Sequence, residues 1–305
     1  MLFETHTINS GRPGPALLII AGVHGDEYEG VEAVRRLMTV AEEDLACGSV
    51  TLVPVANLSA FEAANRTGED GLDLARTFPG APDGSITQRV AHALFLLIKQ
   101  SDAFIDLHSG GKLFRLSPLV GYMLVDDHSV LDLQRRMAQA FGLPIVWGTT
   151  AALDGRSLSA ARDAGVPAIY AEYLGGGACS ADGVAAYVDG CLRVMALLGI
   201  TGPPTTPDNS QPTLDRHVVE DPRAGSGHLQ VRNPSPIAGT IEYDVALDDW
   251  LSAGDIIARV RPSDGGDAVA VRADTSGRVI CLAAGSHVEA GVSVAVVLEP
   301  YPPDS

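Results

Sequence analysis

Positive charge is scarce in this sequence of 305 residues. Lys99 and Lys112 are its only lysines, and 21 lysine and arginine residues stand against 38 aspartate and glutamate residues, which gives a formal net charge of −17. Nucleic acids and anionic membrane surfaces attract proteins of the opposite charge, so neither is an expected partner. The acidic balance favours solubility above all, with a weaker bias toward cationic ligands.

Cysteine and long apolar runs are also scarce. The cysteines are Cys47, Cys179, Cys191 and Cys281, and no two of them have the C-x-x-C spacing of a zinc site or a redox pair. We expect four free, buried thiols in a reducing compartment. The longest apolar runs, such as PALLIIAGV from Pro15 onward, are far too short to cross a membrane, and the first residues show no secretory signal. These absences predict a cytoplasmic protein.

Strand-like and helix-like segments alternate from residue 15 to about residue 200. The predicted strands are 16–22, 50–55, 102–108, 119–125, 144–148 and 167–173. The predicted helices are 27–46, 85–100, 130–142, 157–165 and 183–199. Such alternation is typical of an α/β fold in which helices cover a largely parallel sheet. We therefore expect one α/β domain over residues 1–200.

The texture of the sequence changes after residue 200. Residues 201–235 are rich in proline, glycine and polar side chains, which predicts a linker or an irregular crossing segment. Residues 236–305 show short alternating strands, and within them 238–260 resembles 276–297, as in a barrel-sandwich hybrid domain. No lysine follows Lys112, so this β domain cannot carry a covalently attached swinging arm. The roles that remain for the β domain are a structural role and that of a lid.

Two histidines lie near the carboxyl ends of predicted strands. His24 and Glu27, in the stretch AGVHGDEYEG, come shortly after the strand at 16–22, and His108 is the last residue of the strand at 102–108. An H-x-x-E spacing alone is close to chance and also fits a capped helix with solvated acids. Ligand sites in open α/β sheets gather at the carboxyl ends of the strands, so both histidines are expected at one edge. Two imidazoles and one carboxylate then form a three-ligand zinc set with one open position.

One glutamate and two arginines of two further stretches fall near the same edge. Glu172 ends the strand at 167–173 before three glycines, which suits a general base acting on water or, alternatively, a solvated loop glutamate. Arg66 and Arg76 lie in the long polar loop at 65–80, where one can stabilise an oxyanion and the other can bind a carboxylate.

Two aspartates and the remaining histidines are assigned smaller roles. Asp26 is predicted to cap the helix after His24 or to support the site, and Asp106 either supports His108 or faces solvent. The other six histidines stand outside any ligand spacing: His6, His92, His128, His217, His228 and His287. A helix is expected to start near His128.

Together these stretches resemble the succinylglutamate desuccinylase/aspartoacylase family, a branch of the zinc carboxypeptidase group, over residues 15–200. GVHGDEYEG is similar to the family's G-x-H-G-[ND]-E, DLARTFPG to its D-L-N-R-x-F-P-G, DLHSGG to its D-L-H, and AEYLGGG to its strand ending in the catalytic glutamate. HGDEYEG and FPG look most similar to members that deacetylate N-acetyl-diaminobutyrate. The resemblance implies a zinc-carboxypeptidase-like mixed sheet flanked by helices, followed by a β domain.

The resemblance also implies roles for single residues. His24, Glu27 and His108 would bind one zinc ion (Zn2+) per chain. Glu172 would activate the zinc-bound water that attacks the acyl carbonyl of a small N-acyl amino acid, and would then protonate the leaving amine. Arg66 would polarise that carbonyl. Arg76, in the DLARTFPG stretch, would bind the carboxylate of the substrate.

Ala75 departs from the family pattern, which usually has asparagine there to help bind the carboxylate. This departure leaves the exact acyl group and amine open, and it is the one residue that favours a non-catalytic relict. A metallo-carboxypeptidase acting on short peptides is the other rival, and it requires that the β domain does not roof the cleft. The sequence also leaves a homo-oligomer open.

Overall fold

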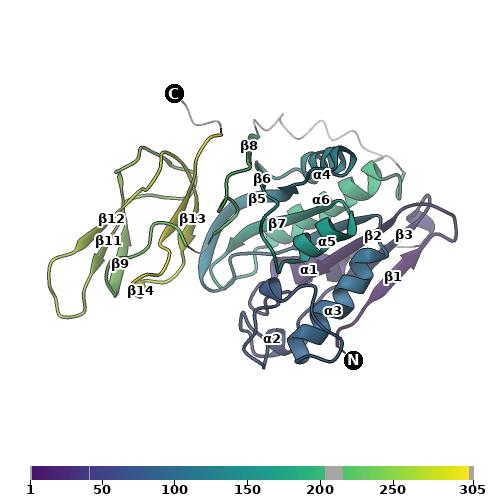
Figure 1. Ribbon diagram of the computed structural model, residues 1–305, viewed down its shortest axis with the longest axis horizontal. Helices are drawn as coiled ribbons and strands as arrows, with labels where there is room; N and C mark the ends of the chain where they lie inside the picture. The colour runs from purple at the N-terminus through teal and green to yellow at the C-terminus, as the bar shows by residue number, and fades with distance from the viewer. Residues whose placement is uncertain (1, 41, 203–215, 230, 302–305) are drawn as a thin grey trace.

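An eleven-stranded mixed sheet is the centre of the structure, a computed structural model that describes residues 2–40, 42–202, 216–229 and 231–301 (Figure 1). Its main path runs through β1 (His6–Asn9), β3 (Ser49–Val53), β2 (Ala16–Ala21), β4 (Ala103–Leu107), β7 (Ala168–Gly175), β5 (Phe114–Leu124), β13 (Gly277–Ala283) and β10 (Trp250–Leu251). Off this path, β15 (Ala295–Leu298) pairs with β13, β6 (Ile145–Thr150) pairs with β5, and β8 (His217–Asp221) pairs with β6.

Strand direction in this sheet is mixed. The neighbours β3, β2, β4 and β7 are parallel, whereas β5 runs antiparallel to β7 and parallel to β6. The predicted α/β class with a mixed sheet is therefore confirmed. Because β2, β4 and β7 are parallel, their carboxyl ends meet at one edge of the sheet. His24, Glu27, His108 and Glu172 follow or occupy those ends, whereas Arg66 and Arg76 lie in the segment after α2 (Leu58–Glu62).

Helices cover both faces of the sheet (Figure 1). The residues of β2 alternate between two cores, so that Leu17 and Ile19 pack with one set of helices and Leu18 and Ile20 with the other. The first set comprises α1 (Glu29–Leu37), α4 (His128–Phe141) and α6 (Ala181–Leu197), and the second comprises α3 (Ile86–Lys99) and α5 (Ser157–Ala164). Short helical turns complete the domain at α2 (Leu58–Glu62), η1 (Glu42–Asp44) and η2 (Leu74–Arg76).

Most predicted elements lie within two residues of those observed. The helix expected at 27–46 is an exception, because α1 ends at Leu37 and a separate turn, η1, follows. The strand expected at 119–125 is also longer, since β5 begins at Phe114. His128 is the first residue of α4, as predicted, and the Asp127 side chain caps that helix.

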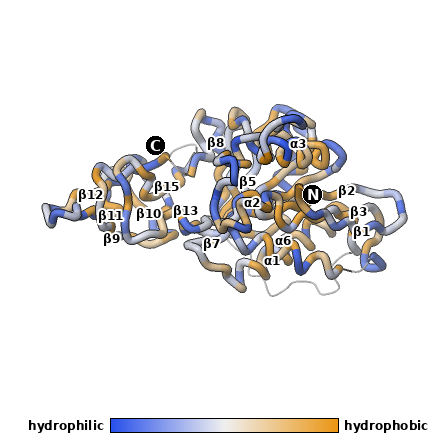
Figure 2. Tube along the Cα trace, turned by 90° about the horizontal axis from the view of Figure 1, so that it is seen from below, coloured by the Kyte–Doolittle hydropathy of each residue, from blue (hydrophilic) through white to orange (hydrophobic). Residues whose placement is uncertain are grey.

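The C-terminal region is connected to the main sheet. Among the described residues beyond 216, every regular element is a strand. A separate four-stranded sheet contains β12 (Val269–Arg272), β11 (Ile256–Arg261), β9 (Gly239–Tyr243) and β14 (His287–Val288). Figure 2 shows a hydrophilic tip where β11 turns into β12. The barrel-sandwich shape stays a prediction, but β13 of this region pairs directly with β5.

The stretch predicted as a linker, 201–235, contains β8, which extends the main sheet by pairing with β6. The sequence did not predict this strand, because its buried residues, such as Val219, lie in a stretch rich in prolines and glycines. Positions 203–215 and 230 lie outside the described residues. Among the described residues, no helix has the length and apolar character needed to cross a membrane.

The cysteines are less buried than expected. All four are free, but Cys179 is exposed and Cys47 is half-buried, so the expectation of four buried thiols is wrong for these two. Cys191 and Cys281 are buried, in α6 and β13 respectively.

Candidate metal and catalytic site

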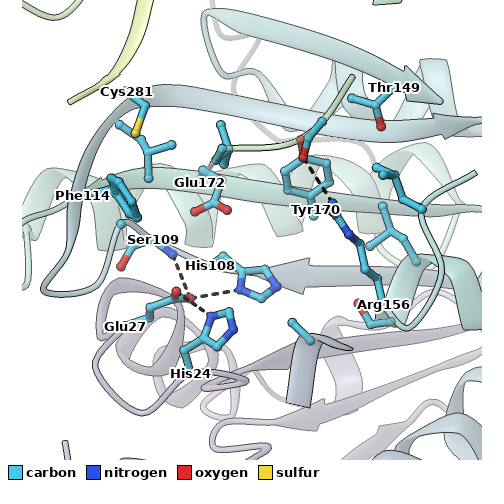
Figure 3. Close-up of a pocket in the computed structure, with 18 of the residues that line it drawn as sticks. His24, Glu27, His108, Ser109, Phe114, Thr149, Arg156, Tyr170, Glu172 and Cys281 are labelled. Atoms are coloured by element: carbon cyan, nitrogen blue, oxygen red, sulfur yellow. Dashed lines mark hydrogen bonds and ion pairs between the residues drawn. The ribbon is translucent and has the colours of Figure 1, made fainter. Parts of the chain in front are cut away.

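The structure brings His24, Glu27 and His108 together. Ala21 at the end of β2 pairs with Leu107 at the end of β4, so the two histidine rings lie only 5.3 Å apart. The Glu27 carboxylate lies between them, with Oε1 2.7 Å from Nδ1 of His24 and Oε2 3.0 Å from Nδ1 of His108 (Figure 3). Each residue offers one donor atom, and these atoms lie within 4.8 Å of one another. This arrangement can hold a metal ion.

Electrostatics keep the cluster charged. Burial alone would raise the pKa of Glu27, but the imidazoles of His24 and His108 outweigh it and hold the pKa below its usual range. Burial alone would lower the pKa of His108, but the carboxylates of Asp106 and Glu27 raise it well above its ordinary value. The excess of carboxylate oxygens around two imidazoles gives the cluster an affinity for cations.

A second carboxylate contacts the far nitrogen of each histidine. Nε2 of His24 lies 3.1 Å from Oδ1 of Asp73, and Nε2 of His108 lies 3.1 Å from Oδ2 of Asp106. Asp106 is 1% exposed and accepts a hydrogen bond from the Ser157 hydroxyl, so it supports the site and does not face solvent. Such carboxylates orient metal-binding histidines and raise their basicity. Asp73 was missed in the sequence, although it lies within the DLARTFPG stretch.

Backbone contacts fix the loops that carry the cluster. The backbone N–H of Ser109 donates to Glu27 Oε2 at 3.2 Å, and the Tyr187 hydroxyl donates to the carbonyl of His108 at 2.6 Å. Asp26 accepts a hydrogen bond from the backbone N–H of Lys112 at 2.8 Å. Asp26 therefore joins the two loops and does not cap α1, for which Tyr28 is the N-cap residue.

Glu172 lies inside β7, and the strand continues beyond it to Gly175. It is next to the cluster, because the backbone N–H of His108 donates to the carbonyl of Ala171 at 2.8 Å. Figure 3 shows its carboxylate directed into the same pocket as the histidines. Its Oε2 atom is buried and has no hydrogen-bond partner among the described residues. Burial raises the pKa of Glu172 well above its ordinary value, which suits a group that takes up and releases a proton.

Three arginines line the pocket. Arg66 donates to Asp73 Oδ2 through Nε at 3.1 Å, and its Nη1 atom lies 3.5 Å from Nδ1 of His24. Arg76 donates through Nη1 to the carbonyl of Ala75 at 2.7 Å. Arg156, which the sequence did not indicate, lies at the start of α5, and burial together with the charge of Arg76 lowers its pKa.

The rest of the pocket comes from segments far apart in the chain. The lining residues absent from the predicted set include Ser109, Phe114, Leu116, Thr149, Arg156, Ser157, Tyr170, Leu229 and Cys281. They belong to the loop after β4, to β5, β6, β7, the start of α5, β13 and the loop after β8, and no local spacing in the sequence indicates that these segments meet.

The fold and this site define an α/β protein with a mixed sheet and a candidate metal centre at the edge of that sheet. Residues 13–198 match the family model of the succinylglutamate desuccinylase/aspartoacylase catalytic domain, and the chain belongs to that family. The resemblance predicted from the sequence motifs is confirmed.

Individual relatives cover nearly the whole chain. The chain is 33% identical to the N-alpha-acetyl-L-2,4-diaminobutyric acid deacetylase of Halomonas elongata over 296 residues, which are 94% of this chain and 82% of the relative. It is similar to the crystal structure of a succinylglutamate desuccinylase from Silicibacter sp. TM1040, with a TM-score of 0.86, 28% identity, and coverage of 97% of this chain and 88% of that one. It is also similar to the product-bound ectoine utilization protein EutE (DoeB) from Ruegeria pomeroyi, with a TM-score of 0.86, 30% identity, and coverage of 96% and 87%.

Proposed function

We propose that this protein is a zinc-dependent deacylase that hydrolyses the amide bond of a small N-acyl amino acid. The observation that carries the proposal is the cluster of His24, Glu27 and His108 beside the free carboxylate oxygen of Glu172. Membership of the family, and the names deacetylase and desuccinylase borne by relatives, support hydrolysis of a linear amide. N-acetyl-2,4-diaminobutyrate is the first substrate to test. The four free cysteines support a cytoplasmic location.

The donor set fits zinc. Two imidazole nitrogens and one carboxylate are typical ligands of a catalytic zinc site, and the carboxylates of Asp73 and Asp106 contact the far nitrogens as such sites require. A bound zinc ion would supply Lewis acidity, polarising a carbonyl and lowering the pKa of water.

The chain's own residues then divide the remaining work. Glu172 takes the proton of the attacking water and passes it to the leaving amine, as its raised pKa allows. Arg66 lies beside His24 and donates to the carbonyl oxygen as negative charge develops there. Arg76 binds the carboxylate of the amino acid in bidentate fashion.

Ala75 lines the pocket beside Arg76 but has no polar side-chain atom. The carboxylate therefore depends on guanidinium groups, and Arg156 supplies a second one close enough to Arg76 to lower its own pKa. Two positive groups at this end favour an anionic carboxylate over a neutral amide.

Metal analysis combined with a hydrolysis screen tests the proposal. We expect one zinc ion per chain and hydrolysis of at least one N-acyl amino acid in a broad panel. The Glu172→Gln variant should keep its zinc and lose activity by about 10³-fold. Zinc-loaded protein that hydrolyses no member of the panel would refute the function, and loss of zinc in the variant would make Glu172 a ligand and not the base.

A further inference from the structure

Glu172 stands between two ends of the pocket. Tyr170 and Glu172 share one face of β7, since they lie two residues apart along the strand, and both line the pocket. In the register with β5, Gly121 lies opposite Tyr170 and Leu116 lies opposite Leu174. Two residues along a strand span roughly 6 to 7 Å, so Tyr170 and Leu116 mark positions on either side of the catalytic carboxylate.

The end that contains Tyr170 is cationic. Arg156 lies near Tyr170 and close enough to Arg76 for the two positive charges to interact. Figure 3 shows Arg156 and Tyr170 on one side of Glu172. This end suits the carboxylate of an amino acid.

The other end is an apolar wall, formed by Phe114, Leu116, Leu229 and Cys281. Cys281 of β13 pairs with Leu116 of β5, which places the thiol of the C-terminal region in the pocket. Figure 3 shows Phe114 and Cys281 on the side of Glu172 away from Arg156. None of the four described side chains of this wall carries a charge, because burial raises the pKa of Cys281 and keeps its thiol protonated.

Arg115, the cation next to this wall in the sequence, does not add a charge to it. Arg115 lies between Phe114 and Leu116 in β5, so its side chain points to the opposite face of the strand, and the residue is exposed. The pocket is therefore positive at one end and uncharged at the other.

We propose that the apolar wall receives the acyl group and that Cys281 limits its length, so that the enzyme accepts short uncharged acyl groups and rejects succinyl. This inference rests on the proposed function. The carbonyl carbon carries the amine and the acyl chain on opposite sides, so binding of the amino-acid carboxylate by Arg76 directs the acyl chain toward the wall. A succinyl carboxylate would lose its hydration there without a cationic partner, close to the carboxylate of Glu172.

Acyl-chain selectivity tests the inference. We expect kcat/KM to favour the N-acetyl over the N-succinyl derivative of the same amino acid by at least about 100-fold, since an unpaired buried charge is strongly rejected. Cys281→Ala should raise the ratio of kcat/KM for the butyryl substrate to that for the acetyl substrate by about 10-fold, because removal of the sulfur atom makes room for a longer acyl chain. Cys281→Val should shift the ratio the other way. Cys191→Ala, which removes a buried thiol in α6 outside this pocket, should leave the ratio unchanged.

Binding provides a readout that does not depend on turnover. Calorimetric titration of the Glu172→Gln protein should show tighter binding of the N-acetyl than of the N-succinyl compound. Absence of hydrolysis across the whole panel would count against the proposed function itself. Hydrolysis that favours succinyl, or that leaves the butyryl-to-acetyl ratio unmoved in both Cys281 variants, would overturn the inference while the proposed function stands.

Discussion

Nε2 of His24 lies 3.1 Å from Oδ1 of Asp73, and the other oxygen of Asp73 binds the guanidinium of Arg66. One carboxylate thus holds both a candidate zinc ligand and the group proposed to polarise the carbonyl. Contacts with His24, Arg66 and Arg76 outweigh burial and lower the pKa of Asp73, so it stays ionised in the folded protein. An ionised carboxylate on the far nitrogen fixes the orientation of the imidazole.

Replacement of Asp73 by asparagine is expected to weaken zinc binding by about 10- to 100-fold, because the His24 ring loses its ionic partner. Competition with a chromogenic chelator measures this affinity. Asp70→Asn is the matched control, since Asp70 lies in the same loop but accepts hydrogen bonds from the backbone and side chain of Thr87. The control should lower the melting temperature and leave zinc affinity intact. Equal zinc loss in both variants would assign the effect to the loop and not to Asp73.

Substitutions of Arg66 and of Arg76 are expected to change different kinetic parameters. Arg66→Gln should lower kcat by about 10²- to 10³-fold, because its contact strengthens as charge develops on the carbonyl oxygen. Arg76→Gln should chiefly raise KM, because a bound carboxylate is present before and during the reaction. Steady-state kinetics on the best substrate of the panel separate the two. A reversal of the pattern would exchange the two assigned roles.

The sequence indicated that His24, Glu27 and His108 would cluster, because the rule that predicts this is local. His24 and His108 each come directly after an apolar strand, and neighbouring parallel strands bring the loops at their carboxyl ends to one edge of the sheet. Glu172 could be placed in the same way. The position of Glu172 within β7 could not be predicted, because the sequence of the strand gives no signal for the residue at which its backbone pairing ends.

Other features depended on contacts between distant segments. Arg156 and Cys281 reach the pocket only because α5 packs under the sheet edge and β13 pairs with β5. β8 was hidden for a related reason. Its five residues lie in a stretch whose composition favours a linker, and only pairing with β6 makes it a strand.

Glu220 of β8 ties this strand to the rest of the sheet. Arg135 of α4 donates to it through Nε at 2.7 Å and through Nη2 at 2.8 Å, and the Tyr122 hydroxyl donates to it at 2.5 Å. The contact with Arg135 lowers the pKa of Glu220 below its ordinary value. The ionised form is therefore favoured in the folded protein.

A lowered folded-state pKa gives a stability contribution that depends on pH in a defined sense. It is complete above the unfolded pKa of about 4.3 and disappears as pH falls through the folded value. Glu220→Gln should therefore lower the free energy of unfolding by about 1 kcal/mol at pH 7, given partial exposure of the pair. Urea titrations should show the difference from wild type shrinking below about pH 4. A difference that grows on acidification would contradict the assignment.

The C-terminal region is expected to be indispensable for folding. Four residues of this region form one buried cluster with side chains of the main sheet that include Phe114, Leu116 and Trp147: Ile280 and Cys281 of β13, and Val296 and Leu298 of β15. Exposure of several such side chains costs about 1.5 to 3 kcal/mol each, which together approaches the whole stability of a typical domain. A chain truncated after residue 235 should therefore aggregate or bind a hydrophobic dye, and peptide hydrolysis by it would not test the peptidase alternative. As a control, replacing the exposed turn at 263–267 by a shorter glycine-serine turn should preserve zinc content and activity. A truncated chain that stays monomeric, retains zinc and keeps its rate would show that the shared cluster contributes little to folding.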